Sequence, residues 1–405
     1  MNRPGRPLVL VGYADALAAI ESAWSLVDGG FDVIGLARAR TRPALRWSRS
    51  VTLRQVTDPG TDAGAAVDDV ARLVRELRPA AVVALDDQMV WVCRQLDRRT
   101  DPRTDPRPFP AGDQAELALD KRLQVRLAGK AGLAGKAGLA TPPTLFIEAA
   151  EDWPAAFDFP LVVKPALAAE LAGRRLSRQH AIVCRDAAQL AAARQRLTPP
   201  LLVQPLIRGV GEGVFGLATA TGVTAWSGHR RVRMMNPQGS GASACVSQPV
   251  APGVRQQVAD FVAAAGWHGM FMVELLRDEQ GVAWFMELNG RAWGSMALAR
   301  RRGLAYPAWT VQDALGLPLH PAPPEEPPPL MCRHIGRELL HLAFVARGPA
   351  TGGADESWPR LGAAVRDVLS FHGGGQLYNS RRREPMVLLA DTVQTLAAQV
   401  RKARG

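Results

Sequence analysis

Two acidic residues and an amide stand at positions where they could share one face of a β-hairpin. Glu274 lies in the first of two apolar runs, and Glu287 and Asn289 lie in the second. A polar centre, residues 277–281, separates the runs and ends in glycine, a pattern typical of a hairpin turn. The types of these three residues predict a site for a hard cation such as Mg²⁺, shared with phosphate oxygens.

The strand register decides whether these side chains meet. Pairing Arg277 with Val282 places Glu274 opposite Phe285. Residues two apart share a face, so Glu274 and Glu287 become diagonal neighbours about 7–8 Å apart at Cα. A solvated strand face would carry the same residue types, and a one-residue shift would send Glu274 to the other face.

Basic residues stand near the ends of other predicted strands. Lys164 ends an apolar run, where a buried lysine needs a partner. Arg231 and Arg233 alternate with Val232, so both arginines face one way, beside a Gly/Ser-rich loop at 236–243. Paired arginines beside such a loop suit a phosphate or a carboxylate, although a solvated strand face explains them equally well.

The segment Glu287-Leu288-Asn289-Gly290-Arg291, preceded by Glu274, resembles the signature of the ATP-grasp superfamily. Its continuation, Trp293-Gly294-Ser295, resembles a bacterial branch of predicted carboxylate–amine ligases, which is similar to the large subunit of carbamoyl-phosphate synthase. The resemblance covers residues 116–318 best. It implies an N-terminal Rossmann-like domain followed by two α+β lobes that enclose ATP.

The resemblance also implies roles for individual residues. The metal, Mg²⁺ or Mn²⁺, would be bound by Glu274, Glu287 and Asn289. Basic side chains for the ATP phosphates would be Lys121, which opens a helix, and Lys164. The adenine would contact Gln204, Pro205 and Leu206, and the ribose would contact Glu212. The catalytic residues would be Arg291, Lys164, Arg231 and Arg233. Of these, Arg291 would stabilise the charge on the transferred phosphoryl group.

The implied activity joins a small-molecule carboxylate to an amine through an acyl phosphate, forming an amide or peptide bond. Two alternatives stay open: an enzyme resembling carbamoyl-phosphate synthase or a carboxylase, and a non-catalytic nucleotide-binding protein. The loop after Lys164 offers only Gly173 instead of a Gly-rich phosphate loop, which favours the last alternative slightly. Its donors would be Arg174, Arg175, Ser177 and His180. Asp86 and Asp87, after a predicted strand, either contact substrate or cap the next helix.

Strand and helix patterns alternate at the start of the chain, which predicts an α/β class with a small parallel sheet. A helix is expected from Ala14 to Val27. The proline-rich segment 100–110 is expected to be an exposed connector. The predicted organisation is a pre-grasp domain (1–115), a small lobe (116–200), a large lobe (201–320), a Pro-rich linker (321–329) and a C-terminal extension of unknown role (330–405). A duplicated six-residue unit, LAGKAG, occupies 127–138.

The composition of the chain limits the classes of partner that we expect. The net charge is +11, yet the arginines are spread along the chain without interleaved aromatic residues, so no specific nucleic-acid partner is expected. No apolar run approaches the roughly 20 residues of a membrane span. The four cysteines are far apart in sequence, and no signal peptide is expected, so a cytoplasmic location is predicted. The expected partners are small molecules, with a homodimer left open.

Overall fold

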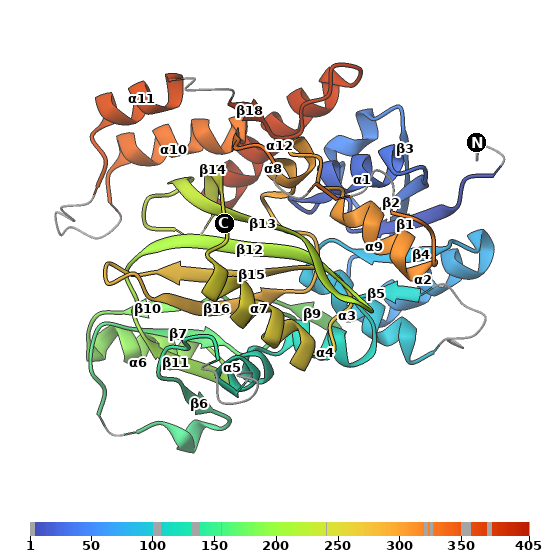
Figure 1. Cartoon of the computed structure of the whole chain (residues 1–405). Coiled ribbons are helices and arrows are strands. Elements are labelled where there is room, and N and C mark those ends of the chain that lie inside the picture. The colour runs from blue at the N-terminus through green and yellow to red at the C-terminus, as the bar shows by residue number, and fades with distance from the viewer. Residues whose placement is uncertain are drawn as a thin grey trace.

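The computed structural model describes residues 5–99, 107–130, 138–154, 156–239, 241–319, 323–324, 327–349, 358–370 and 375–404. Its strands form a five-stranded, a four-stranded and a seven-stranded sheet, and a separate two-stranded hairpin. In Figure 1 the seven-stranded sheet lies in the middle, with the four-stranded sheet below it and the five-stranded sheet to its right. The predicted α/β class is confirmed.

The five-stranded sheet is parallel throughout, in the order β3-β2-β1-β4-β5. Its strands are β1 Leu8–Gly12, β2 Asp32–Arg38, β3 Val51–Val56, β4 Ala81–Ala84 and β5 Arg107–Phe109. Every residue of β1 and β4 is buried, as expected for parallel strands covered on both faces. The helical segments around this sheet are α1 Ala19–Asp28, a 3₁₀ turn Ala44–Trp47, α2 Ala63–Leu77 and α3 Asp87–Asp97.

Two expectations for this domain were wrong in detail. The first helix begins at Ala19 and not at Ala14, because residues 14–18 form turns; the Ala14 N–H is bonded to the Leu36 carbonyl of β2 (2.8 Å). The end of the proline-rich segment is not an exposed connector, because Arg107–Phe109 forms the edge strand β5. An edge strand tolerates proline, since one side of it needs no ladder hydrogen bonds. The rest of that segment, 100–106, lies outside the described residues.

The four-stranded sheet is antiparallel, in the order β10-β7-β11-β6. Its strands are β6 Leu145–Ile147, β7 Leu161–Pro165, β10 Ile182–Cys184 and β11 Leu201–Pro205, accompanied by a 3₁₀ turn Ala150–Asp152 and by α6 Ala187–Arg196. Between β7 and β10 the chain forms the two-stranded hairpin of β8 Glu170–Ala172 and β9 Arg175–Ser177. The predicted strand ending at Lys164 is therefore confirmed as β7.

The seven-stranded sheet has the order β16-β15-β12-β13-β14-β17-β18. Its strands are β12 Val210–Thr219, β13 Gly222–Met234, β14 Ala242–Gln248, β15 Gly269–Arg277, β16 Ala283–Asn289, β17 Met331–Arg333 and β18 Gln376–Leu377. The helices of this half are α7 Pro252–Ala264, α8 Met296–Arg301, α9 Tyr306–Ala314, α10 Ile335–Arg347, α11 Leu361–Leu369 and α12 Pro385–Arg404. The C-terminal region thus contributes two strands to the large sheet.

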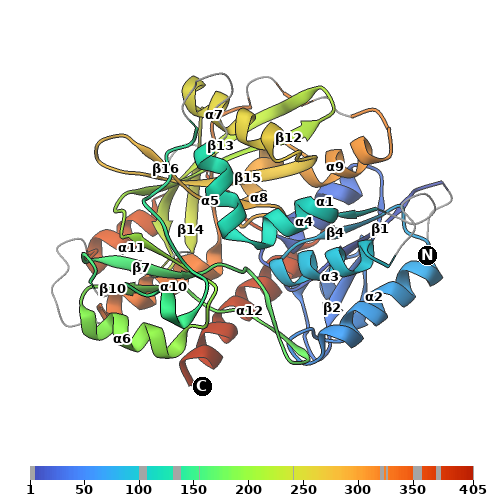
Figure 2. The ribbon, with the colours of Figure 1, turned by 90° about the horizontal axis from the view of Figure 1, so that it is seen from below.

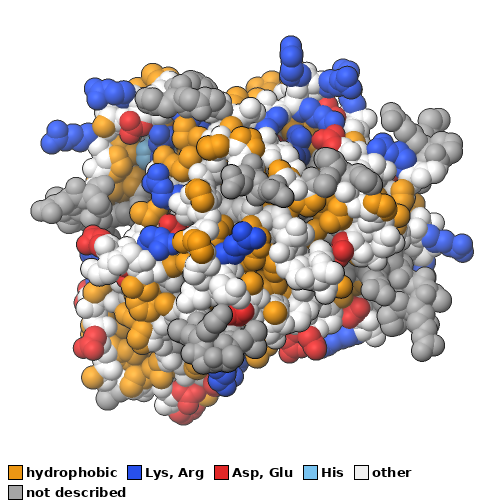
Figure 3. All heavy atoms as spheres, viewed as in Figure 1, with side chains coloured by type: hydrophobic (Ala, Val, Ile, Leu, Met, Phe, Trp, Pro, Cys, Tyr) orange, Lys and Arg blue, Asp and Glu red, His pale blue; other side chains and the backbone are white. Residues whose placement is uncertain are grey.

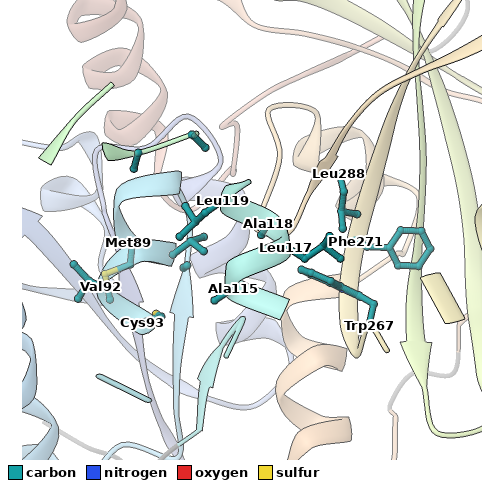
Figure 4. Packing of buried hydrophobic residues seen from close by; sticks show 14 of the residues in the cluster. Met89, Val92, Cys93, Ala115, Leu117, Ala118, Leu119, Trp267, Phe271 and Leu288 are labelled. Carbon is teal, nitrogen blue, oxygen red and sulfur yellow. The ribbon is translucent and has the colours of Figure 1, made fainter. Parts of the chain in front are cut away.

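Helices α4 Gly112–Leu119 and α5 Lys121–Lys130 link the N-terminal domain to the large sheet (Figure 2). Figure 4 shows Leu117 and Ala118 of α4 between Met89 of α3 and the side chains of Trp267 and Leu288. One apolar cluster therefore runs from the N-terminal sheet through α4 into the large sheet, which holds the two parts in a common core. The proposed domain boundaries stay a prediction. Residues 131–137, which include most of the second LAGKAG unit (133–138), lie outside the described residues.

Candidate functional site

The β15–β16 hairpin brings Glu274 and Glu287 face to face. Near the turn the strands pair Arg277 with Ala283, one residue away from the expected register. Continued unbroken, that register would place the two carboxylates on opposite faces. A β-bulge at Met286 adds one residue to β16, so Glu274 pairs directly with Glu287. The predicted register was therefore wrong, but the bulge restores the shared face.

Each of the two carboxylates has a cationic neighbour. Arg231 Nη2 lies 2.6 Å from Glu274 Oε1, and Lys121 Nζ lies 3.4 Å from Glu287 Oε2. Burial raises the pKa of Glu274, against the effect of Arg231. Burial would also raise the pKa of Glu287, but Lys121, Arg291 and Lys164 bring it below its usual value. At neutral pH Glu287 is therefore the more firmly ionised of the pair.

The donor set fits a hard dication. Glu274 and Glu287 offer carboxylate oxygens from adjacent strands, and Met272, which precedes Glu274 by two residues, pairs with Asn289. Asn289 is buried, with its amide nitrogen 3.4 Å from Met272 Sδ, so its oxygen is the part free to act as a ligand. Within the described ranges, no group of three or more His, Cys, Asp or Glu residues could hold a metal ion. Two carboxylates and an amide suit Mg²⁺ that takes its remaining ligands from phosphate and water.

Arg291, directly beyond β16, is oriented by Asp87 of the N-terminal domain. Arg291 Nε lies 2.9 Å from Asp87 Oδ1, and Arg178 Nη2 lies 3.5 Å from the other carboxylate oxygen. Burial works to raise the pKa of Asp87, but the two arginines hold it below the usual range. The adjacent Asp86 caps α3, accepting from the Met89 N–H at 2.9 Å, and also pairs with Arg38. Asp86 is therefore a helix cap, and a substrate contact by either aspartate stays a prediction.

A cavity of about 540 Å³ lies against these groups. It lies at the carboxyl ends of β1, β2 and β4, where the strand order of the parallel sheet reverses, a common place for ligands. The N-terminal domain contributes Asp15, Arg38 and Asp86, and the segment after β9 contributes Arg178. The large sheet and the segment after it contribute His229, Arg231, Glu274, Glu287, Asn289 and Arg291. The C-terminal region contributes Arg337 and Tyr378.

The structure brings five of the predicted site residues together on the cavity wall: Arg231, Glu274, Glu287, Asn289 and Arg291. Lys121 contacts this group of residues by its ion pair with Glu287. Lys164 is half-buried on β7, with its Nζ 4.0 Å from Met286 Sδ in the bulge, and burial lowers the pKa of this lysine. Both lysines are therefore close to the acid pair without lining the cavity.

The other predicted residues have different neighbours. Gln204 is buried and donates to Thr144 Oγ1 (2.8 Å), and the Leu206 N–H donates to the Pro160 carbonyl (3.0 Å). Glu212 accepts two hydrogen bonds from Arg277, at 2.9 and 2.8 Å. Arg233 pairs with buried Glu338 of α10 and does not line the cavity. The roles of Gln204, Pro205, Leu206, Glu212 and Arg233 in binding or catalysis stay predictions.

The β8–β9 hairpin, in the place of the expected phosphate loop, docks on the N-terminal domain. The Ala63 N–H donates to the Arg174 carbonyl and the Leu176 N–H donates to the Pro59 carbonyl, both at 2.8 Å. The Arg174 guanidinium pairs with Asp62. Arg174 is thus directed away from the acid pair, and the side chain from this segment that reaches the cavity is Arg178.

Sequence reasoning assigned no role to several cavity residues. Arg38 ends β2 and could have been found from its place at a strand's carboxyl end. His229 lies two residues before Arg231 on β13. Its Nδ1 lies 2.7 Å from Ser295 Oγ, and burial, followed by Arg231, lowers its pKa to about 3. The ring is therefore neutral at physiological pH. No sequence signal linked Arg337 or Tyr378 to the hairpin.

Two features bear on the class of partner: the placement of basic residues on the surface, and whether any helix could span a membrane. On the face shown in Figure 3, the lysines and arginines that the structure describes lie in separate groups among apolar and polar atoms. Among the described residues, no helix is long and apolar enough to cross a bilayer. The absence of a specific nucleic-acid partner stays a prediction.

No protein-family model matches this chain, and no curated protein matches it. Several solved protein structures are similar to it in fold. An L-amino acid ligase from Bacillus licheniformis aligns with a TM-score of 0.58 and 18% identity, over 80% of this chain and 78% of that one. The ADP complex of PurK, N5-carboxyaminoimidazole ribonucleotide synthetase, aligns with a TM-score of 0.61 and 12% identity, over 90% of this chain and 96% of that one.

A third similar structure is the biotin carboxylase domain of the 2-oxoglutarate carboxylase from Hydrogenobacter thermophilus, in complex with MgADP, ADP and bicarbonate. It aligns with a TM-score of 0.58 and 15% identity, over 78% of this chain and 70% of that one. At these identities the likeness concerns the fold. An N-terminal parallel sheet, a small antiparallel sheet and a large sheet with a facing acid pair together give this chain the ATP-grasp fold.

Proposed function

We propose that this chain is an ATP-dependent carboxylate–amine ligase. The single observation that supports this most is the facing pair Glu274 and Glu287, on the wall of a cavity that also contains Arg291. The substrate carboxylate would attack the γ-phosphate of ATP to give an acyl phosphate and ADP. The amine would then displace phosphate and form the amide bond. No side-chain nucleophile is needed for either step.

The chain's own residues would bind and orient the reactants. Glu274, Glu287 and Asn289 would hold Mg²⁺, which neutralises phosphate charge when it is bound. Lys121 would exchange Glu287 for phosphate oxygens as its partner, and Lys164, whose Nζ lies 4.0 Å from Met286 Sδ, would also bind phosphate oxygens. Arg291 lines the cavity, with its Nε held by Asp87 and its Nη1 donating to the Ala292 carbonyl (3.1 Å), and it would stabilise the charge that develops on the transferred phosphoryl group.

A carboxylase-like reaction with bicarbonate as acceptor is the second candidate. It is kept because one of the similar structures was solved with MgADP and bicarbonate. Replacing the organic carboxylate by bicarbonate distinguishes the two: a carboxylase-like enzyme would release ADP with bicarbonate, whereas the ligase requires an organic carboxylate.

We expect ATP to bind only when Mg²⁺ is present, because two facing carboxylates repel phosphate until a dication lies between them. Isothermal titration calorimetry with ATP, with Mg²⁺ and with EDTA, measures this directly. A screen of small carboxylates crossed with amines, followed by ADP release, then identifies turnover. ATP binding that ignores Mg²⁺, or none at all, would contradict the assigned metal site. Binding without turnover for any pair would favour a non-catalytic nucleotide-binding protein.

Arg291→Lys is expected to leave ATP affinity nearly unchanged and to slow ADP release by about 10- to 100-fold. Lysine keeps the charge but loses the planar fork that can bind Asp87 and a phosphoryl group together. Calorimetry and ADP release on the same preparation separate binding from chemistry. Arg300→Lys is the matched control, because Arg300 pairs with Glu21 and Asp28 and does not line the cavity. If both variants lost activity equally, Arg291 would have no special role in turnover.

A further inference from the structure

The C-terminal region forms one end of the cavity. Strand β17 pairs with β14, placing Cys332 opposite Cys245, and the first turn of α10 follows directly. Arg337 lies in that turn and its Nη1 donates to the Ala242 carbonyl (2.9 Å). Tyr378 follows β18 and is anchored by its N–H to the Arg333 carbonyl (2.8 Å). The large lobe alone would therefore leave this end of the cavity open.

Arg337 differs from the other arginines that line the cavity in its lack of a carboxylate partner among the described residues. Arg38 pairs with Asp15 and Asp86, Arg178 and Arg291 share Asp87, and Arg231 pairs with Glu274. Within the part of the chain that the structure describes, no carboxylate oxygen lies within 4.0 Å of the Arg337 guanidinium. Asp391 acts on it from farther away, and that carboxylate already accepts a hydrogen bond from Asn379 (2.9 Å).

The surroundings of Arg337 suit an anion. Burial lowers the pKa of Arg337, so its positive charge is unfavourable without a counter-ion, and a bound anion would offset this. Gly241 lets the guanidinium approach the backbone, because a Cβ there would lie 3.3 Å from Arg337 Nη1. Burial also raises the pKa of Tyr378 well above its usual value, so its hydroxyl stays protonated, and it is hydrogen-bonded to Cys245 on the same cavity wall. A bound carboxylate would take the place of Cys245 as the partner of this hydroxyl, while its other oxygen binds the Arg337 fork.

Sheet order shows which carboxylate this would be. Glu287 is on β16, whereas Arg337 donates to the Ala242 carbonyl on β14, four strands away in the sheet, and both side chains extend from these positions into the same cavity. The carboxylate that is activated must lie beside Glu287 and Arg291, at the β16 end. A second carboxylate at the β14 end therefore belongs to the other reactant, which approaches the acyl carbon from the remaining part of the cavity.

We infer that the amine substrate carries its own carboxylate, as an amino acid does, and that Arg337 and Tyr378 of the C-terminal region bind it. This inference rests on the proposed ligase function and adds the class of the amine substrate. The amine nitrogen displaces phosphate from the acyl phosphate, while the carboxylate of the same molecule stays on Arg337 and is not activated. The C-terminal region thereby becomes a determinant of substrate choice.

The test compares amines that differ only in this group. With ATP, Mg²⁺ and a carboxylate substrate saturating, ADP release is measured with each of a panel of L-amino acids and with the matching amino acid amides. We expect the wild-type protein to use amino acids at least tenfold better, in kcat/KM, than their amides. Arg337→Gln should raise the amino acid KM by about 10- to 100-fold, leave the KM for ATP unchanged, and remove the preference over the amide.

Three further variants sharpen the result. Arg337→Lys should lose less than Arg337→Gln, because the charge remains. Gly241→Ala should raise the amino acid KM without removing any charge, because the new methyl group displaces the guanidinium. Arg347→Gln, an exposed position at the end of the same helix, should change nothing. Thermal unfolding of each variant without ligands shows whether it is folded.

The outcomes separate this inference from the proposed function. Equal use of amino acids and amides by the wild-type protein would overturn the inference and leave the ligase intact, as would an Arg337→Gln effect confined to the carboxylate substrate. Absence of ADP release with every amine would instead contradict the proposed function. In that case, stabilisation of the MgADP-loaded protein by an amino acid but not by its amide, lost in Arg337→Gln, would still support the carboxylate site, and its absence would overturn it.

Discussion

Glu287→Gln is expected to reduce ADP release by about 100-fold or more while the protein stays folded. The substitution keeps the size of the side chain but removes a charge that faces Glu274 across the hairpin and Lys121 from α5. Loss of one carboxylate from a metal site costs several kcal/mol of transition-state stabilisation, which corresponds to at least this factor. The Mg²⁺ dependence of ATP binding should weaken as well.

Stability should respond far less than activity to this change. Removing one of two facing carboxylates relieves their repulsion, which offsets the lost contact with Lys121. Thermal unfolding, calorimetry with MgATP and ADP release on the same sample measure all three effects. Glu279→Gln is the matched control, since Glu279 is exposed in the turn of the same hairpin. Near-normal turnover by Glu287→Gln would mean that the hairpin is not the metal site.

Glu338→Ala is expected to give the largest loss of stability, about 3–5 kcal/mol in the free energy of unfolding. Glu338 is 5% exposed and pairs with Arg233, so its removal leaves a guanidinium buried without its counter-ion. Urea denaturation gives the free energy, with Glu76→Ala as the control. Glu76 forms an exposed ion pair with Arg72 within α2, and such pairs contribute only about 0.3–0.5 kcal/mol.

A double variant tests the same pair from the other side. Replacing Arg233 by Met and Glu338 by Leu together removes both charges, and most of the lost stability should return. ADP release by this double variant also tests the catalytic role that the sequence suggested for Arg233. Substantial activity in a refolded double variant would show that Arg233 is needed for docking α10 on the large sheet and not for chemistry. Failure to regain stability would show that the pair's packing, and not its charge, is what matters.

Local sequence was sufficient to predict much of the fold. The alternation of strand and helix patterns at the start of the chain predicted a parallel sheet, which β1, β2 and β4 form with β3 and β5. The two-residue alternation around Glu287 and Asn289 placed both on one face, since side chains of a strand alternate strictly. Lys164 at the end of β7 was likewise readable from its position after an apolar run.

Other features were decided only by tertiary structure. The bulge at Met286 depends on how β16 pairs with β15, and no residue type at that position requires it. The start of α1 also involves a distant segment, because Ala14 lies in a turn that is bonded through its N–H to Leu36 of β2. Register and helix ends are thus settled by partners that lie far away in the sequence.

The set of residues that line the cavity is the clearest example of a feature that only the tertiary structure decides. Asp87 and Arg291 are 204 residues apart in sequence, yet they form one ion pair because α3 begins where β16 ends in space. Arg337 and Tyr378 come from a region that the sequence marked only as an extension, and they reach the cavity because β17 and β18 complete the large sheet. Sequence alone determined which residues can bind metal and phosphate, since that follows from their types and local spacing. Tertiary structure decided which of them meet, because contacts between distant segments depend on how the sheets pack.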